Sequence, residues 1–109
     1  MTTQPSDLLG HMVDNMTSEN WWQGSLMNGN RRKRCMMGHL ELAQVQYNAL
    51  AGSSIAWRAC DRLLAAIAVF TDSDRSSIDG FNDNHHTTFE DISLVVKQAY
   101  VNALEEDTQ

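Results

Sequence analysis

The chain has 109 residues, of which 42% are hydrophobic, and it carries one proline and six glycines. This length fits one domain, and the apolar content is too high for an intrinsically disordered chain. The net charge of −6 argues against a general nucleic-acid-binding protein, because such proteins present excess positive charge to phosphates. The scarcity of proline and glycine favours helices over many short strands. We therefore expect a single all-α domain over residues 1–109.

The cysteines and the N-terminal sequence indicate a cytoplasmic protein. Cys35 and Cys60 are far apart, and no Cys-x-x-Cys motif occurs. Residues 1–20 lack the basic start and apolar run of a secretion signal, and no apolar run reaches the ~20 residues that span a bilayer. We expect reduced thiols, with a disulfide between the two cysteines as the alternative.

Apolar residues recur at helical spacing in four segments of the chain. The expected helices cover residues 6–17, 35–50, 54–71 and 88–105. The chain ends, residues 1–5 and 106–109, are expected to fray.

The start of the last helix offers two reciprocal caps. Thr87 with Glu90 and Thr88 with Asp91 both have the required spacing. Of these, only the pair of Thr87 and Glu90 has the residue types of the standard capping box.

The segment from Ile55 to Phe70 is the most apolar helix of the chain. Its only charged residues, Arg58, Asp61 and Arg62, all lie in its first half. A helix that is apolar on nearly every face must be covered on several sides. We therefore expect a compact bundle of about four helices, with this one at the centre.

The longest irregular stretch is expected over residues 21–34. Adjacent Trp21 and Trp22 cannot share one helix face, so we expect one in the core and the other at an edge or groove. The stretch ends in the basic run Arg31-Arg32-Lys33-Arg34, the only sequence signal for nucleic acid. The tryptophans would support this role by stacking on bases. The alternative is a solvated loop, because four charges neutralise few phosphates.

A second irregular stretch, residues 72–87, holds the densest polar cluster, with Ile78 and Phe81 as expected buried anchors. The cluster consists of Asn82, Asp83, Asn84, His85 and His86. It precedes a helix N-terminus, where free N–H groups and the helix dipole favour an anion. One interpretation is a pocket for a carboxylate or phosphate. The alternative is that the asparagines and the aspartate bond their own turn, while the histidines are solvated.

Two further interpretations concern Cys35. Cys35 and His39 are four residues apart, so they would project from one side of a helix and form a zinc site with His85 or His86. Alternatively, the neighbouring cations would lower the pKa of Cys35, and His39 would act as its base. A buried structural cysteine is the commoner case, and no known zinc-finger spacing occurs. We predict no metal and no cofactor.

Four short motifs occur in a fixed order. They are Trp21-Trp22-Gln23-Gly24, Cys35-Met36-Met37-Gly38-His39-Leu40, Phe81-Asn82-Asp83 and the cap residue Thr88. In this order they resemble a family of small domains of unknown function found in actinobacteria and their phages. The likeness covers residues 8–104 and departs at Phe81, where tryptophan is usual, and at residues 84–86, where a small Gly/Arg-containing turn is usual. It implies a fold and a phage or actinobacterial setting, but no activity.

We therefore predict a phage or actinobacterial accessory module that engages a host protein or its own copies without catalysis. The alternative is a small-ligand or metal pocket, which would allow catalysis, built from residues 21–24 and 81–88. The residues expected to bind a ligand or partner are Trp21, Trp22, Gln23, His39, Asn82, Asp83, His85 and His86. A third prediction is nucleic-acid contact through residues 31–34. Whether the two irregular segments meet in one concave pocket separates a pocket from a surface-recognition role.

Overall fold

The computed structural model of the chain describes residues 3–24, 33–49, 53–73 and 77–107. The helices are α1 (Pro5–Asn15), α2 (Met36–Gln46), α3 (Ser54–Thr71), α4 (Ile78–Asp83) and α5 (Phe89–Asp107). No strand occurs in these ranges, where an isolated β-bridge joins Trp21 and Arg34. The all-α prediction is confirmed. The four predicted helices correspond to α1, α2, α3 and α5, whereas α4 lies in a stretch that was predicted to be irregular.

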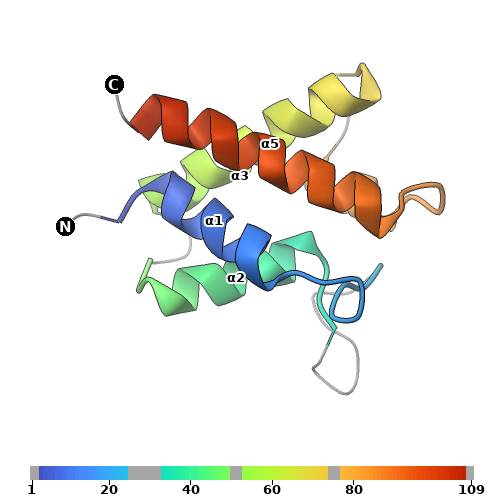
Figure 1. Cartoon of the computed structure of the whole chain (residues 1–109), viewed down its shortest axis with the longest axis horizontal. Helices are drawn as coiled ribbons and strands as arrows, with labels where there is room; N and C mark the ends of the chain where they lie inside the picture. Colours follow the sequence, from blue (N-terminus) through green and yellow to red (C-terminus); the bar gives the residue numbers. More distant parts are fainter. Residues whose placement is uncertain (1–2, 25–32, 50–52, 74–76, 108–109) are drawn as a thin grey trace.

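The helices α1 and α5 run side by side in opposite directions through the molecule (Figure 1). The short helix α1 also contacts α2 and α3, while α3 packs against α5 and α4. The largest buried apolar side chains of the core are Leu8, Leu9, Met12, Met36, Leu40, Leu63, Ile67, Ile92, Val95 and Val96. The helices α1 and α3 thus each contact three other helices. Across the described ranges, no helix combines the length and apolar character needed to cross a membrane.

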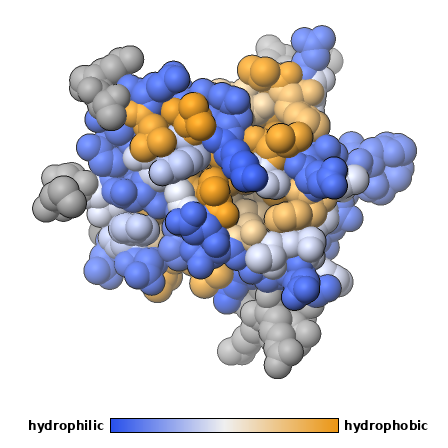
Figure 2. Space-filling model, viewed as in Figure 1, coloured by the Kyte–Doolittle hydropathy of each residue, from blue (hydrophilic) through white to orange (hydrophobic). Residues whose placement is uncertain are grey.

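The helix α3 contacts α1, α4 and α5, as the expected bundle requires, but these neighbours cover one face of it and not nearly every face. Its buried residues, Ala56, Ala59, Leu63, Ala66 and Ile67, form one stripe at helical spacing. On other faces Trp57 is 64% exposed and Val69 is 80% exposed. Figure 2 shows hydrophobic side chains at the surface over the C-terminal part of α3 and beside α5. The reason is that α2 packs on α1 and α4, so it leaves much of α3 bare.

Side-chain caps fix the starts of α3 and α5. Ser53 Oγ accepts a hydrogen bond of 3.3 Å from Ala56 N, so Ser53 is the N-cap and α3 begins at Ser54. At α5, Thr88 N donates to Asp91 Oδ2 at 3.0 Å, and Asp91 N donates to Thr88 Oγ1 at 3.3 Å. The structure therefore forms the second of the two predicted capping pairs, and not the pair of Thr87 and Glu90.

The two ends of the described chain are tied together. Arg58 and Arg62 of α3 form ion pairs with Glu106 of α5, and the Ser6 N–H donates to Asp107 Oδ2 at 3.0 Å. Both acidic residues were expected in a frayed tail, yet α5 continues to Asp107. Residues 108 and 109 lie outside the described part.

Candidate functional site

The helix α4 carries the central part of the predicted polar cluster. Ser77 Oγ caps it by accepting a hydrogen bond of 2.9 Å from Gly80 N. Its apolar anchors Ile78 and Phe81 are buried, as expected. Because Asn82 follows Phe81 on the inward side of the helix, its side chain is carried into the protein, where it is fully buried.

The side chain of Asn82 uses its whole hydrogen-bonding capacity. Its Oδ1 accepts from Trp21 Nε1 at 2.7 Å and from Met36 N at 3.0 Å. Its Nδ2 donates to the Trp22 carbonyl at 3.0 Å and to Asp83 Oδ1 at 2.9 Å. A side-chain amide has two acceptor sites and two N–H donors, so none is left for a ligand. Asn82 thereby joins the Trp21–Trp22 segment, the start of α2 and the end of α4.

Gln23 and Gly24 extend this connection. Gln23 Nε2 donates to the carbonyls of Asn82 at 3.1 Å and Asn84 at 2.9 Å. Gly24 N donates to Asp83 Oδ1 at 2.7 Å, and Gly24 has φ = 115°, which favours glycine. We call residues 21–24 and 82–84, joined by these bonds, the clasp.

The two irregular segments therefore meet, as the pocket interpretation required. Their polar atoms, however, bind one another across the two segments. The turn-forming alternative holds for Asn84, whose Oδ1 accepts from His86 N at 2.9 Å, but not for Asn82, whose main partners lie far away in the sequence. The tryptophans divide as expected: Trp21 is partly buried with its ring 6.1 Å from that of Phe89, whereas Trp22 is exposed. The described buried polar atoms without a hydrogen bond are Arg62 Nε and Asp107 Oδ1, and neither belongs to the clasp. The clasp is an internal connection with its polar groups satisfied.

His39 and Cys35 do not have the electrostatics of a catalytic pair. His39 is buried, its Nε2 lies 2.9 Å from the Asn20 carbonyl oxygen, and burial lowers its pKa. Burial raises the pKa of the Cys35 thiol, which corrects the expectation that the basic run would lower it. The thiol is therefore held in the less nucleophilic, protonated form.

The remaining predicted groups do not gather around a metal. The rings of His85 and His86 lie against each other with centroids 4.0 Å apart and planes tilted by 40°, and both residues are exposed. Within the described ranges, no three His, Cys, Asp or Glu side chains are placed to hold a metal ion, so Cys35, His39 and His85 do not form a ligand set. Both cysteines are free, so the alternative of a disulfide is not realised.

The basic run is only partly described. Arg31 and Arg32 lie outside the described residues. Arg34 pairs through its backbone, accepting from Trp22 N at 2.9 Å and donating to the Asn20 carbonyl at 2.8 Å. Lys33 and Arg34 are partly exposed.

Two sizeable hollows lie on the described surface. One, of about 350 Å³, borders the clasp at Asn84 and is also lined by His86 and by the edge-to-face ring pair Phe70 and Phe81, centred 5.7 Å apart. The other is a groove of about 850 Å³ between α2 and α3. The groove is lined by Met37, Leu40, Glu41, Gln44, Val45, Asn48, Ala49, Ala56, Trp57 and Cys60.

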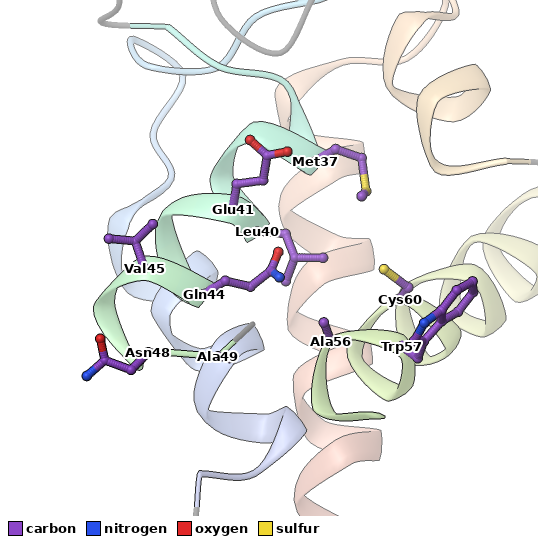
Figure 3. A pocket seen from close by; sticks show the side chains of 10 residues that line it. All are labelled: Met37, Leu40, Glu41, Gln44, Val45, Asn48, Ala49, Ala56, Trp57 and Cys60. Atoms are coloured by element: carbon purple, nitrogen blue, oxygen red, sulfur yellow. The ribbon is translucent and has the colours of Figure 1, made fainter. Parts of the chain in front are cut away.

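The groove has apolar walls and a polar outer edge. Met37 and Leu40 point from α2 toward α3, and Ala56 and Cys60 face them from α3 (Figure 3). Trp57 lies at the edge of the groove with 64% of its surface exposed. The groove was not predicted from the sequence. The available signal was that α3 has more apolar residues than one buried stripe needs.

A family model matches most of the chain. It is the model of a family of unknown function, DUF6197, and it matches residues 1–101. No curated protein and no solved structure matches the chain.

Proposed function

Because the chain belongs to this family of unknown function, we propose a role from its geometry. It is a non-catalytic module that holds an α-helix of another polypeptide in the α2–α3 groove. The observation that carries the proposal is the open apolar groove with exposed Trp57 at its edge. Exposed apolar patches of this kind mark interaction sites, and grooves between helices accept the apolar face of an amphipathic helix.

The dimensions of the groove suit a helix. Its α2 wall runs from Met37 to the helix end at Gln46 and continues in the turn up to Ala49. At 1.5 Å per residue, the helical part is roughly 14 Å long, which equals about two and a half turns of a bound helix. This length accommodates apolar residues at i, i+3 or i+4, and i+7, the spacing by which such helices dock.

A small apolar molecule is the second candidate occupant. The volume of about 850 Å³ lies in the range of small-molecule pockets. Glu41, Gln44 and Asn48 would supply the few polar groups that orient such a ligand. The openness of the groove to one side, and the bare apolar face of α3 that adjoins it, favour the polypeptide.

Three observations support a role without catalysis. Burial shifts the pKa of Cys35 upward and that of His39 downward, so neither group is tuned as a nucleophile–base pair. The described residues contain no metal-ligand group. The polar atoms of the clasp are engaged with one another. The phage or actinobacterial setting and the host cytoplasm belong to the proposal as well, and they rest on the sequence resemblance.

The proposal is tested by selecting helical peptides from a displayed library and comparing two matched variants. Cys60→Phe adds bulk inside the groove, whereas Leu94→Phe adds bulk to the exposed face of α5. Selected peptides should bind Cys60→Phe at least about tenfold more weakly, because the filled groove excludes the apolar anchors. They should bind Leu94→Phe as they bind the natural chain.

Nuclear magnetic resonance locates the bound peptide independently. The expected shifts fall on α2 and α3 around the groove. Shifts confined to the clasp or to His85 and His86, with equal binding to both variants, would remove the groove from the account. If the library yields no binding peptide, and small apolar compounds displace an apolar dye from the groove, the small-ligand candidate is favoured instead.

A further inference from the structure

The charges around the groove indicate what kind of helix it accepts. From Cys35 to Trp57 the sequence contains no lysine or arginine, and its one acidic residue is Glu41. Glu41 lines the groove, is exposed, and has no ion-pair partner within the described residues. The α2 wall therefore presents a single uncompensated negative charge beside an apolar surface.

The α3 wall adds a second negative charge. Asp61 follows Cys60, which lines the groove, and is itself exposed. Burial raises the pKa of Cys60, and the Asp61 carboxylate raises it further, which places that charge close to the groove wall. The two cations near Asp61 on α3, Arg58 and Arg62, both form ion pairs with Glu106 of α5. Neither pairs with Asp61.

We infer that the occupant of the groove is a basic amphipathic helix of a different protein, with lysine or arginine flanking its apolar anchors. This inference rests on the proposed function. Apolar side chains would fill the space between Leu40, Ala56 and Cys60, and one cation would reach Glu41 in the groove lining. Another would reach exposed Asp61, which lies one helical turn after Trp57 on the same side of α3. Complementary charge at an interface selects partners and speeds association.

A second copy of the chain fits the groove less well. In a two-fold dimer the same patch faces itself. The acidic groups Glu41 and Asp61 would then face a patch that carries the same two charges, with no cation among the described residues of the groove lining to separate them. Each copy also carries a net charge of −6, so long-range repulsion adds to the local one.

The test uses two fluorescent peptides of about 18 residues, each designed as a helix with leucine at i, i+3 or i+4, and i+7. One carries lysine on the flanking positions, and the other carries glutamate at the same positions. We expect the lysine peptide to bind roughly tenfold more tightly at low salt, with the difference shrinking as salt rises. The double variant Glu41→Lys, Asp61→Lys should reverse the preference, because both residues are exposed and the fold does not depend on their charge.

Trp57→Ala should weaken the lysine peptide at least about tenfold, because an exposed tryptophan at a groove edge is a typical anchor of binding energy. The matched control is Trp22→Ala, which removes another exposed tryptophan outside the groove. Sedimentation should give the mass of a monomer. A dimer that Trp57→Ala abolishes would overturn the inference in favour of a second copy.

The failures of the two proposals are distinguishable. If both peptides bind in the groove with equal affinity and the double variant changes nothing, the inference about charge is wrong, while the groove remains a polypeptide-binding surface. If neither peptide binds and library selection also yields no groove-dependent peptide, the proposed function itself is wrong.

Discussion

The clasp and the α2–α3 groove differ in how far the rest of the chain satisfies their side chains. The clasp is rich in polar side chains, and its buried amide, Asn82, makes four hydrogen bonds within the protein. The groove is rich in apolar side chains, and Trp57 and Met37 on its walls have no neighbour across the gap to cover them fully. Polar residues whose pattern suggests a ligand site can thus serve to hold the fold together. In this chain, the surface that remains for binding is the exposed apolar one.

The sharpest way to break this contrast is Asn82→Ala. The change leaves Trp21 Nε1 and Met36 N without their shared acceptor in a buried site. With about 1–3 kcal/mol for each orphaned group, we expect a loss of roughly 3 kcal/mol or more in the free energy of unfolding. Urea unfolding followed by circular dichroism measures it. The control is exposed Asn84→Ala, and a loss below about 1 kcal/mol for Asn82→Ala would show that the clasp is not structural.

Gly24→Ala tests the clasp through its backbone. Gly24 has φ = 115°, where a side chain is strained, and its N–H bonds Asp83 Oδ1 at 2.7 Å. We expect a loss of about 1–2 kcal/mol in the free energy of unfolding. An unchanged urea midpoint would mean that this end of the clasp contributes nothing to stability.

The cap that positions α5 beside the clasp offers a matched pair of variants. Thr88→Ala removes the hydroxyl that accepts from Asp91 N at 3.3 Å, and should cost about 1 kcal/mol in thermal or urea unfolding. Thr87→Ala leaves that cap in place and should cost clearly less. Equal losses, or the reverse order, would contradict the assignment of the cap to Thr88.

The smallest effect at neutral pH concerns His39, since it is already uncharged there. Burial lowers its pKa in the folded chain below the ordinary 6.5. The unfolded chain therefore binds the proton more readily, so this residue's contribution to stability is complete above pH 6.5 and is lost as pH falls through the folded pKa. His39→Gln, which retains an N–H donor for the Asn20 carbonyl, should flatten this part of the stability curve. Parallel curves for the two proteins would contradict the assignment.

The periodic helices could be predicted from the sequence because their apolar spacing is local information. The bounds of α3 agree with the prediction, whereas α2 ends at Gln46, close to Asn48 with φ = 55°, and not at residue 50. The helix α4 was missed because Asp79, Gly80 and Asn82 are also typical turn residues. Its formation depends on the Ser77 cap, which is local, and on the burial of Phe81, which depends on the tertiary structure.

The placement of α3 and the nature of the clasp could not be derived from the sequence for a related reason. Apolar residues around a helix show that it needs cover, but not whether the cover comes from its own chain. From the sequence, a meeting of the Trp21–Gly24 and Asn82 segments was likewise a hypothesis only. Only the donor–acceptor geometry around Asn82 shows that these groups satisfy one another.

The central claim, that the clasp serves folding and the groove serves binding, is tested most directly on Trp57→Ala by measuring urea stability and affinity for the lysine-rich helical peptide on one sample. Because Trp57 is 64% exposed, the account predicts a change within about 0.5 kcal/mol in the free energy of unfolding. It also predicts affinity at least about tenfold weaker. Native affinity in Trp57→Ala, with the loss found instead in clasp variants that remain folded, would contradict it.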